Sequence, residues 1–155
     1  MYLGLNEDFH KDTMLTMFPE YQIKGLSIPE SFSWREQRPE CVHNVRNQGK
    51  CGSCWAFSAS EVVSDRFCIA SNGKINEVYS PQHLVDCDYS NMGCQGGFLT
   101  NPFIFYSIVG AQTDECYGEY TSGQTGSSSR FCFLYNWSCP ARRTKLWSIR
   151  IMASE

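Results

Sequence analysis

Nine cysteines in 155 residues, an odd number, constrain this chain more than any other feature. A cytosolic protein would have to keep all of these thiols reduced or bound to metal, so their density indicates an oxidising compartment. Cysteines in a disulfide framework pair off, which leaves one thiol that is either intermolecular or deliberately free. The sequence therefore predicts a disulfide-rich fold with one special cysteine.

Composition and charge exclude several classes of protein. The 42% of hydrophobic residues can form the core of one ordinary domain, and the net charge of −3 gives no basic surface for nucleic acid or an anionic membrane. No apolar run is long enough to span a membrane. The first residues, "MYLGLNEDFHKDTMLTMF", also lack a signal-peptide pattern. We therefore expect no nucleic-acid or membrane partner, and a leader missing from this sequence rather than unusual export.

The first predicted helix follows a turn rich in glycine and cysteine. Apolar residues recur at helical spacing after Cys54, and Gly73 lies where such a helix would stop. We expect the helix to begin at or next to Cys54. The earlier stretch "LSIPESFSWRE" is predicted to be extended around Pro29, because the residue before a proline disfavours helical angles.

Two further segments have helix start signals. In "SPQHLVDC" Ser80 is the expected cap and Pro81 lies in the first turn. In "NPFIFYSIVG" Asn101 is the expected cap, Pro102 follows it and Gly110 ends the segment. The amino-terminal half of the chain is therefore predicted to be mainly helical.

The C-x-x-C formed by Cys51 and Cys54 has three interpretations. A redox dithiol would follow a buried strand, but the preceding "CVHNVRNQGK" is polar. A zinc site would need a second close cysteine pair. The other neighbouring cysteines have six residues between them, and the histidines are scattered: His10, His43 and His83. We expect no metal site.

The third interpretation is a nucleophilic cysteine. A helix N-terminus stabilises a thiolate, and hydrogen-bond donors nearby stabilise the oxyanion that forms when a thiolate attacks a carbonyl. Gln48 and the backbone N–H of Cys54 are candidate donors, and Trp55 would shield the site from water. Taken alone, Gln48 and Trp55 also fit an ordinary loop glutamine and a core aromatic residue.

Four motifs in order resemble papain-like cysteine peptidases. "QGKCGSCWAF" is similar to their nucleophile signature, "YSPQHLVDC" and "GCQGG" follow at the family's spacing, and "IPESFSWREQRPEC" resembles the mature start of cathepsin B-like members. The resemblance covers roughly residues 28–120. It implies an α+β papain-like fold, of which this chain holds the mainly helical left domain, with the β-barrel right domain largely missing.

The resemblance also implies roles for individual residues. Cys54 matches the nucleophile and Gln48 the oxyanion-hole glutamine. The residues expected to bind substrate are Gly52, Ser53, Trp55, Gly96 and Gly97. The implied disulfide bonds are Cys41–Cys68, Cys51–Cys94, Cys87–Cys132 and Cys116–Cys139, of which the last two leave other pairings open. Four bonds leave Cys54 as the free thiol.

Two departures from the family pattern are important: the largely missing right domain and the absence of two catalytic residues. The catalytic histidine and asparagine of the family lie about 130–150 residues after the cysteine, and neither is present here. His83 is expected to be a surface residue of its helix, His43 a loop residue, and His10 precedes the mature-like start. We therefore expect residues 1–25 to be a remnant of a pro-segment, residues 26–155 to be a truncated peptidase domain, and the chain to have negligible turnover alone.

The sequence thus indicates a cathepsin B-like cysteine endopeptidase lineage that acts in proteolysis without a cofactor. Expected partners are peptide or protein substrates and cysteine-peptidase inhibitors, in a lysosome-like or vacuole-like compartment or outside the cell. The alternative is a non-catalytic, disulfide-stabilised protein that binds peptides or inhibitors. Asn136 begins a glycosylation sequon, a pattern that also occurs by chance.

Overall fold

The computed structural model describes residue 27 and residues 29–117, and every regular element within them is helical. The elements are α2 (Trp34–Gln37), α3 (Cys54–Ala70), α4 (Pro81–Cys87), α5 (Asn101–Ile108) and α6 (Asp114–Tyr117), with two 3₁₀ turns, η1 (Pro39–Cys41) and η2 (Gly93–Gln95). Tyr79 and Thr113 form an isolated antiparallel bridge. The prediction of a mainly helical part is confirmed.

Several expectations concern residues outside the described ranges. They are the pro-segment remnant at 1–25, the disulfide partners Cys132 and Cys139, and the sequon at Asn136. A membrane-spanning helix was not expected, and none of the helices in residues 29–117 has the length and apolar character to be one.

α3 begins at Cys54, as predicted. The Ser53 carbonyl accepts a hydrogen bond from the Ala56 N–H at 2.9 Å, which closes the first turn. At the other end the Gly73 N–H donates to the Cys68 carbonyl at 2.8 Å, and Gly73 has φ +79°. Glycine adopts this left-handed conformation at little cost and commonly follows a helix end. The predicted stop is therefore confirmed, with the helix itself ending at Ala70.

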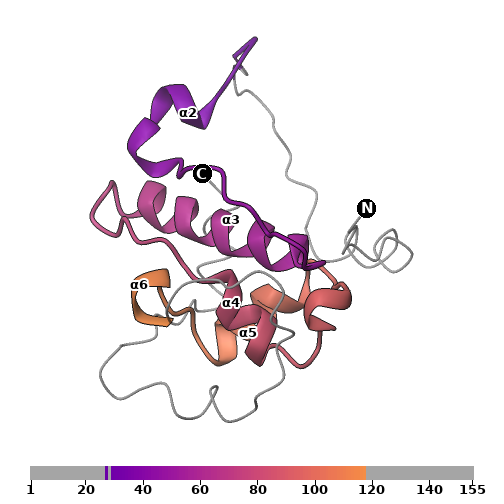
Figure 1. The fold of residues 1–155 in the computed structure, drawn as a ribbon. Helices are drawn as coiled ribbons and strands as arrows, with labels where there is room; N and C mark the ends of the chain where they lie inside the picture. Colours follow the sequence, from indigo (N-terminus) through magenta and orange to yellow (C-terminus); the bar gives the residue numbers. More distant parts are fainter. Residues whose placement is uncertain (1–26, 28, 118–155) are drawn as a thin grey trace.

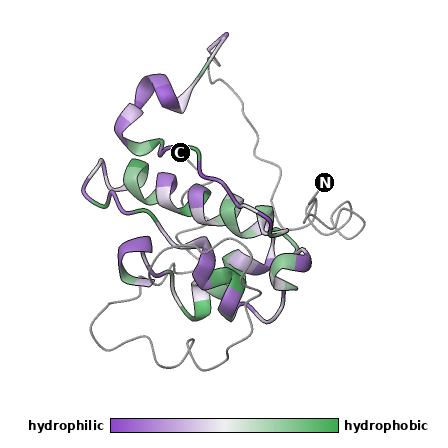
Figure 2. Cartoon of the chain, in the orientation of Figure 1, coloured by the Kyte–Doolittle hydropathy of each residue, from purple (hydrophilic) through white to green (hydrophobic). Residues whose placement is uncertain are grey.

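The core lies between α3 and the helices α4 and α5 that pack against it (Figure 1). Trp55, Tyr79 and Tyr106 have no exposed surface. Smaller residues complete the core: Ala56, Ala59, Val63, Leu84, Val85 and Ala111. Figure 2 shows hydrophobic residues where α4 and α5 meet below α3, whereas α2 is mostly hydrophilic. Because aromatic side chains each bury roughly 150–250 Å², these three contribute much of the hydrophobic stabilisation.

α4 and α5 confirm one cap prediction and correct another. Ser80 Oγ accepts a hydrogen bond from the His83 N–H at 3.4 Å. Pro81 occupies the first helical position, where a backbone N–H would have no acceptor within the helix, so its absence costs no hydrogen bond. Thr100, however, precedes α5, and Asn101 is its first residue. The Asn101 Nδ2 instead donates to the Ser90 carbonyl at 2.9 Å. The prediction that Asn101 is the cap of this helix is therefore wrong by one position, because the Asn101 side chain joins α5 to the preceding turn.

The segment predicted to be extended around Pro29 contains a helical turn. α2 covers Trp34–Gln37, and the Ser33 carbonyl accepts hydrogen bonds from the N–H groups of Glu36 and Gln37, both at 3.1 Å. No residue of α2 is buried. The prediction applies to Ile28, which lies outside the described residues, and residues 29–33 are not helical. The turn that begins at Trp34 was not predicted, because a single exposed turn has no apolar periodicity for a sequence pattern to detect.

The chain before α3 runs alongside that helix (Figure 1) and is held there by a disulfide bond and an arginine. Cys41 is bonded to Cys68, one of the pairs implied by the family resemblance. Arg46 forms ion pairs with Glu61 of α3 and with Asp114 at the start of α6. A lone arginine in a polar loop carries no signal of such a role, so sequence reasoning missed it.

The prediction that His83 lies on the surface is wrong. His83 is only 3% exposed. The centroid of its ring lies 5.2 Å from that of Phe105 and 5.1 Å from that of Tyr117. Its Nδ1 has no hydrogen-bond partner within the described part of the chain. Burial lowers the pKa of His83 to about 4, because desolvation disfavours the charged ring.

The His83 environment predicts a loss of stability in acid. Between pH 6.5 and 4 the unfolded chain protonates this histidine while the folded chain does not, so lowering the pH favours unfolding by about 3 kcal/mol. Burial raises the pKa of Asp86 and Asp114. Protonation of these two carboxyl groups therefore favours the folded chain as the pH falls, opposite to the effect of His83, and both groups are present in wild type and variant.

Urea unfolding of wild type and His83→Gln across this pH range checks the prediction. We expect wild type to lose about 3 kcal/mol more than the variant on acidification. Parallel pH profiles for the two proteins would contradict the account of His83.

Candidate active site

Cys54 combines a free thiol with a helix N-terminus. Among the described cysteines it is the one outside a disulfide bond, and it is partly exposed. The N–H groups of Cys54 and Trp55 have no acceptor within α3, since the first bond to the cap carbonyl comes from Ala56. Unpaired N–H groups and the helix dipole give this end a partial positive charge, so it favours an anion.

The turn before Cys54 is tied to η2. Cys51 is bonded to Cys94, and the Gly52 N–H donates to the Cys94 carbonyl at 2.8 Å. Gln48 Nε2 donates to the Cys51 carbonyl at 2.8 Å, which holds this side chain against the same turn. The Gln48 side chain is thus held against the turn that leads into Cys54. Because Cys51 is committed to Cys94, the pair Cys51 and Cys54 is not a redox dithiol in this structure.

Trp55 supports the site from inside. It is fully buried, and its Nε1 donates to the Gly93 carbonyl at 3.0 Å. Gly97 lies so close that a Cβ built there would be 2.6 Å from the indole ring. Gly52 and Ser53, also predicted to bind substrate, are buried beside Cys54. Trp55 therefore fixes the position of the glycine turn and offers no exposed surface of its own.

Asn91 organises the glycine turn and was missed from the sequence. Its Oδ1 accepts the Phe98 N–H at 2.7 Å, and its Nδ2 donates to Asp88 Oδ2 at 2.7 Å. Gly96 in the turn has φ +123°, a value that favours glycine. Asparagine in a glycine-rich turn is ordinary in exposed loops, so only the folded chain reveals that this side chain holds the turn.

No hydrogen bond within residues 29–117 joins a histidine to Cys54. His43 lies in the loop before α3, as predicted, and its ring nitrogens face Asp65 at 2.8 Å and Asn76 at 2.9 Å. His83 is buried. His10 lies outside the described residues.

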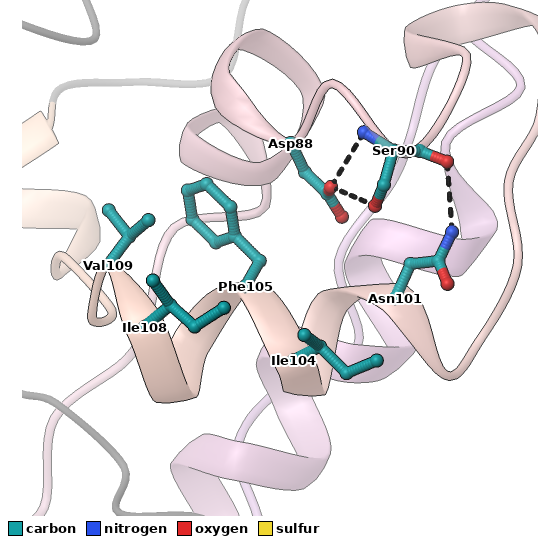
Figure 3. A pocket seen from close by; sticks show the side chains of 7 residues that line it. All are labelled: Asp88, Ser90, Asn101, Ile104, Phe105, Ile108 and Val109. Carbon is teal, nitrogen blue, oxygen red and sulfur yellow. Dashed lines mark hydrogen bonds between the residues drawn. The ribbon is translucent and has the colours of Figure 1, made fainter.

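A separate pocket lies on the outer side of α5 (Figure 3). Ile104, Phe105, Ile108 and Val109 give it an apolar wall, and the polar rim includes Ser90, Asp88 and Asn101. It contains neither Cys54 nor Gln48. The pocket therefore belongs to another face of the helical unit.

Comparison with known proteins decides the family. Residues 28–148 match the family model described as papain family cysteine protease. The chain belongs to the papain family. The family is described as one of cysteine proteases, which are hydrolases, and the predicted papain-like fold is confirmed.

The chain is similar to cathepsin B-like proteins in particular. It is 48% identical to cathepsin B-like CP2 of Giardia intestinalis over 98 residues, which cover 63% of this chain and 32% of the relative. The structure of procathepsin B S9 from Trypanosoma congolense matches with a TM-score of 0.66 and 26% identity, covering 83% of this chain and 46% of that one.

A second solved structure of a cysteine protease matches as well. The Carica candamarcensis cysteine protease CMS1MS2, solved in complex with E-64, has a TM-score of 0.60 and 30% identity, covering 76% of this chain and 51% of that one. The papain-family chain described here thus spans about a third to a half of the length of these relatives.

The contact between Gly97 and Trp55 predicts that Gly97→Ala destabilises the fold. The added methyl group meets a fully buried ring at 2.6 Å and Asn91 Oδ1 at 2.7 Å, so the core must shift. Overpacking of this kind costs about 1–3 kcal/mol.

Urea unfolding measures the effect, with Gly73→Asn as the control. No heavy atom lies within 4 Å of a Cβ at Gly73, and asparagine tolerates its positive φ. We expect the control to change stability by less than about 0.5 kcal/mol. A Gly97→Ala variant with the same free energy of unfolding as wild type would show that the close packing is not required.

Proposed function

We propose that Cys54 is the nucleophile of a cathepsin B-like cysteine endopeptidase. The observation that carries this proposal is a partly exposed free thiol at the first residue of α3, next to a cysteine that is locked in a disulfide bond. The Cys54 thiolate attacks the carbonyl carbon of a peptide bond, and the carbonyl electrons move to oxygen. The resulting tetrahedral intermediate expels the amine, which takes a proton, and water then hydrolyses the thioester.

Two donors stabilise the oxyanion in this proposal. The backbone N–H of Cys54 lies at the N-terminus of α3, and the Gln48 side chain donates to the carbonyl of Cys51, three residues before Cys54. Removal of one such donor typically slows catalysis about 100-fold to 1000-fold.

Gly96 and Gly97 pair with the backbone of an extended substrate. Glycines allow close approach of another chain, and peptides often bind enzymes by adding a strand to exposed backbone. Gly52, Ser53 and Trp55 shape the base of the site, since all three are buried beside it. Expected partners are peptide or protein substrates and cysteine-peptidase inhibitors, as the E-64 complex of the similar CMS1MS2 illustrates.

The leaving amine needs a proton, and within residues 29–117 no hydrogen bond joins a histidine to Cys54 to supply one. His43 is engaged by Asp65 and Asn76, and His83 is buried against aromatic rings. His10 precedes the region of resemblance. We therefore expect these residues alone to form an acyl-enzyme with an activated ester but to cleave peptides negligibly.

Other assignments stay proposals of the same kind. Cys87 and Cys116 are both disulfide-bonded, which accords with the proposed bonds Cys87–Cys132 and Cys116–Cys139. Such a framework suits a lysosome-like or vacuole-like compartment or secretion. Residues 1–25 as a pro-segment remnant, 26–155 as a partial peptidase domain, and glycosylation of Asn136 complete this set.

Acylation by a peptidyl p-nitrophenyl ester tests the nucleophile without a histidine, because p-nitrophenolate leaves without protonation. We expect one p-nitrophenolate per chain and an acyl group on Cys54 by peptide mapping. Cys54→Ser should give no burst. Gln48→Ala should acylate about 100-fold more slowly, whereas Gln37→Ala, an exposed glutamine of α2, should match wild type.

Two results would contradict the proposal. An inert Cys54 in the folded chain would favour the binding protein without catalysis. Rapid hydrolysis of an ordinary peptide would show that this chain contains a proton donor that the account lacks.

A further inference from the structure

His43, Glu61 and Asp65 bring three potential metal ligands together on α3. Their donor atoms all lie within 4.8 Å of one another. Glu61 and Asp65 are four residues apart and therefore share one face of the helix, and His43 comes from the chain that runs alongside it (Figure 1). The scattered histidines of the sequence gave no reason to expect this arrangement, because only the fold places one of them beside two carboxylates.

We propose that His43, Glu61 and Asp65 form a binding site for a divalent transition-metal ion, with Zn²⁺ as the ion that suits it best. Imidazole and carboxylate are both zinc ligands, at about 2.0–2.2 Å from the metal. Two ligands of one ion can therefore lie about 4 Å apart, and small side-chain movements close the remaining gap. An imidazole ligand favours zinc over the oxygen-seeking Mg²⁺ and Ca²⁺.

The hydrogen bonds of His43 are compatible with its role as a metal ligand. Nδ1 lies 2.8 Å from Asp65 Oδ1, and Nε2 lies 2.9 Å from Asn76 Oδ1. The Asn76 amide is oriented by its Nδ2, which donates to the Glu40 carbonyl at 3.0 Å, so its oxygen faces the ring.

A neutral imidazole has one N–H and cannot donate to both of these oxygens. Both oxygens can be satisfied in two ways: a doubly protonated ring donates to each of them, or a metal ion on Nδ1 binds together with Asp65 while Nε2–H donates to Asn76. A carbonyl oxygen that accepts the second ring N–H is the usual support of a histidine ligand.

Charge and access also favour a cation. Two carboxylates, those of Glu61 and Asp65, belong to the site, and Arg46 offsets part of their charge through its ion pair with Glu61. A carboxylate has two oxygens, so Glu61 can bond to Arg46 and still offer a ligand. The side chains of His43, Glu61 and Asp65 are 14%, 27% and 28% exposed, which leaves room for entry and for water ligands.

The site is distinct from the proposed catalytic thiol. Cys54 begins α3, and Asp65 lies roughly 16 Å further along the helix axis. A bound ion would join the loop at His43 to α3, close to the Cys41–Cys68 disulfide bond. Binding would therefore stabilise the attachment of this loop to the helix.

Calorimetric titration of the full chain with Zn²⁺ tests the proposal. Cys54→Ser serves as the parent, because a free thiol is itself a zinc ligand. We expect one Zn²⁺ per chain, a melting temperature that rises with zinc concentration, and no displacement of zinc by millimolar Mg²⁺. In this parent, His43→Ala should weaken zinc binding at least 100-fold, whereas the matched control His10→Ala should leave it unchanged.

Two further variants keep the test sharp. Asn76→Ala retains all three ligands and should weaken binding about 10-fold through loss of the ring's support. Asp65→Asn keeps the shape of the side chain and should also weaken binding, so it carries the test if His43→Ala does not fold. Three results would overturn the proposal. They are absence of zinc binding, zinc affinity in His43→Ala and Asp65→Asn that equals that of the parent, and loss of zinc binding in His10→Ala.

Discussion

Burial of the Trp55 indole fixes the junction on which the rest of the site depends. The ring is fully enclosed, donates to the Gly93 carbonyl, and lies too close to Gly97 for any side chain there. The Cys51–Cys94 bond joins the same two segments across a sequence separation of 43, which by loop-closure entropy contributes roughly 4 kcal/mol. Because of these contacts, the N-terminus of α3 stays beside the glycine turn, where Cys54 meets solvent.

The fold was predictable where local signals agreed with packing. Apolar spacing after Cys54 located α3, and the Ser80 cap located α4. The burial of His83 was not predictable, since it depends on the rings of Phe105 and Tyr117 from other helices. The single turn α2 lacked a pattern altogether, because no residue in it is buried.

Some residues of the candidate site were also predictable from the sequence, and others were not. A motif identifies Cys54 and Gln48, because their chemistry requires particular residues at a particular spacing. Asn91 and Arg46 act through partners that are distant along the chain, so composition and spacing give no indication of their roles. The proposed metal ligands were hidden for this reason too, since His43 meets Asp65 only after the loop has docked on α3.

The central claim is that the two cysteines of one short motif have separate roles, Cys51 in a disulfide bond and Cys54 as a free thiol. Peptide mapping of the native full chain, alkylated under non-reducing conditions, tests it most directly. The account predicts the alkyl group on Cys54 and a linked peptide that joins Cys51 to Cys94. A Cys51–Cys54 disulfide, or Cys54 bonded to any other cysteine, would contradict it.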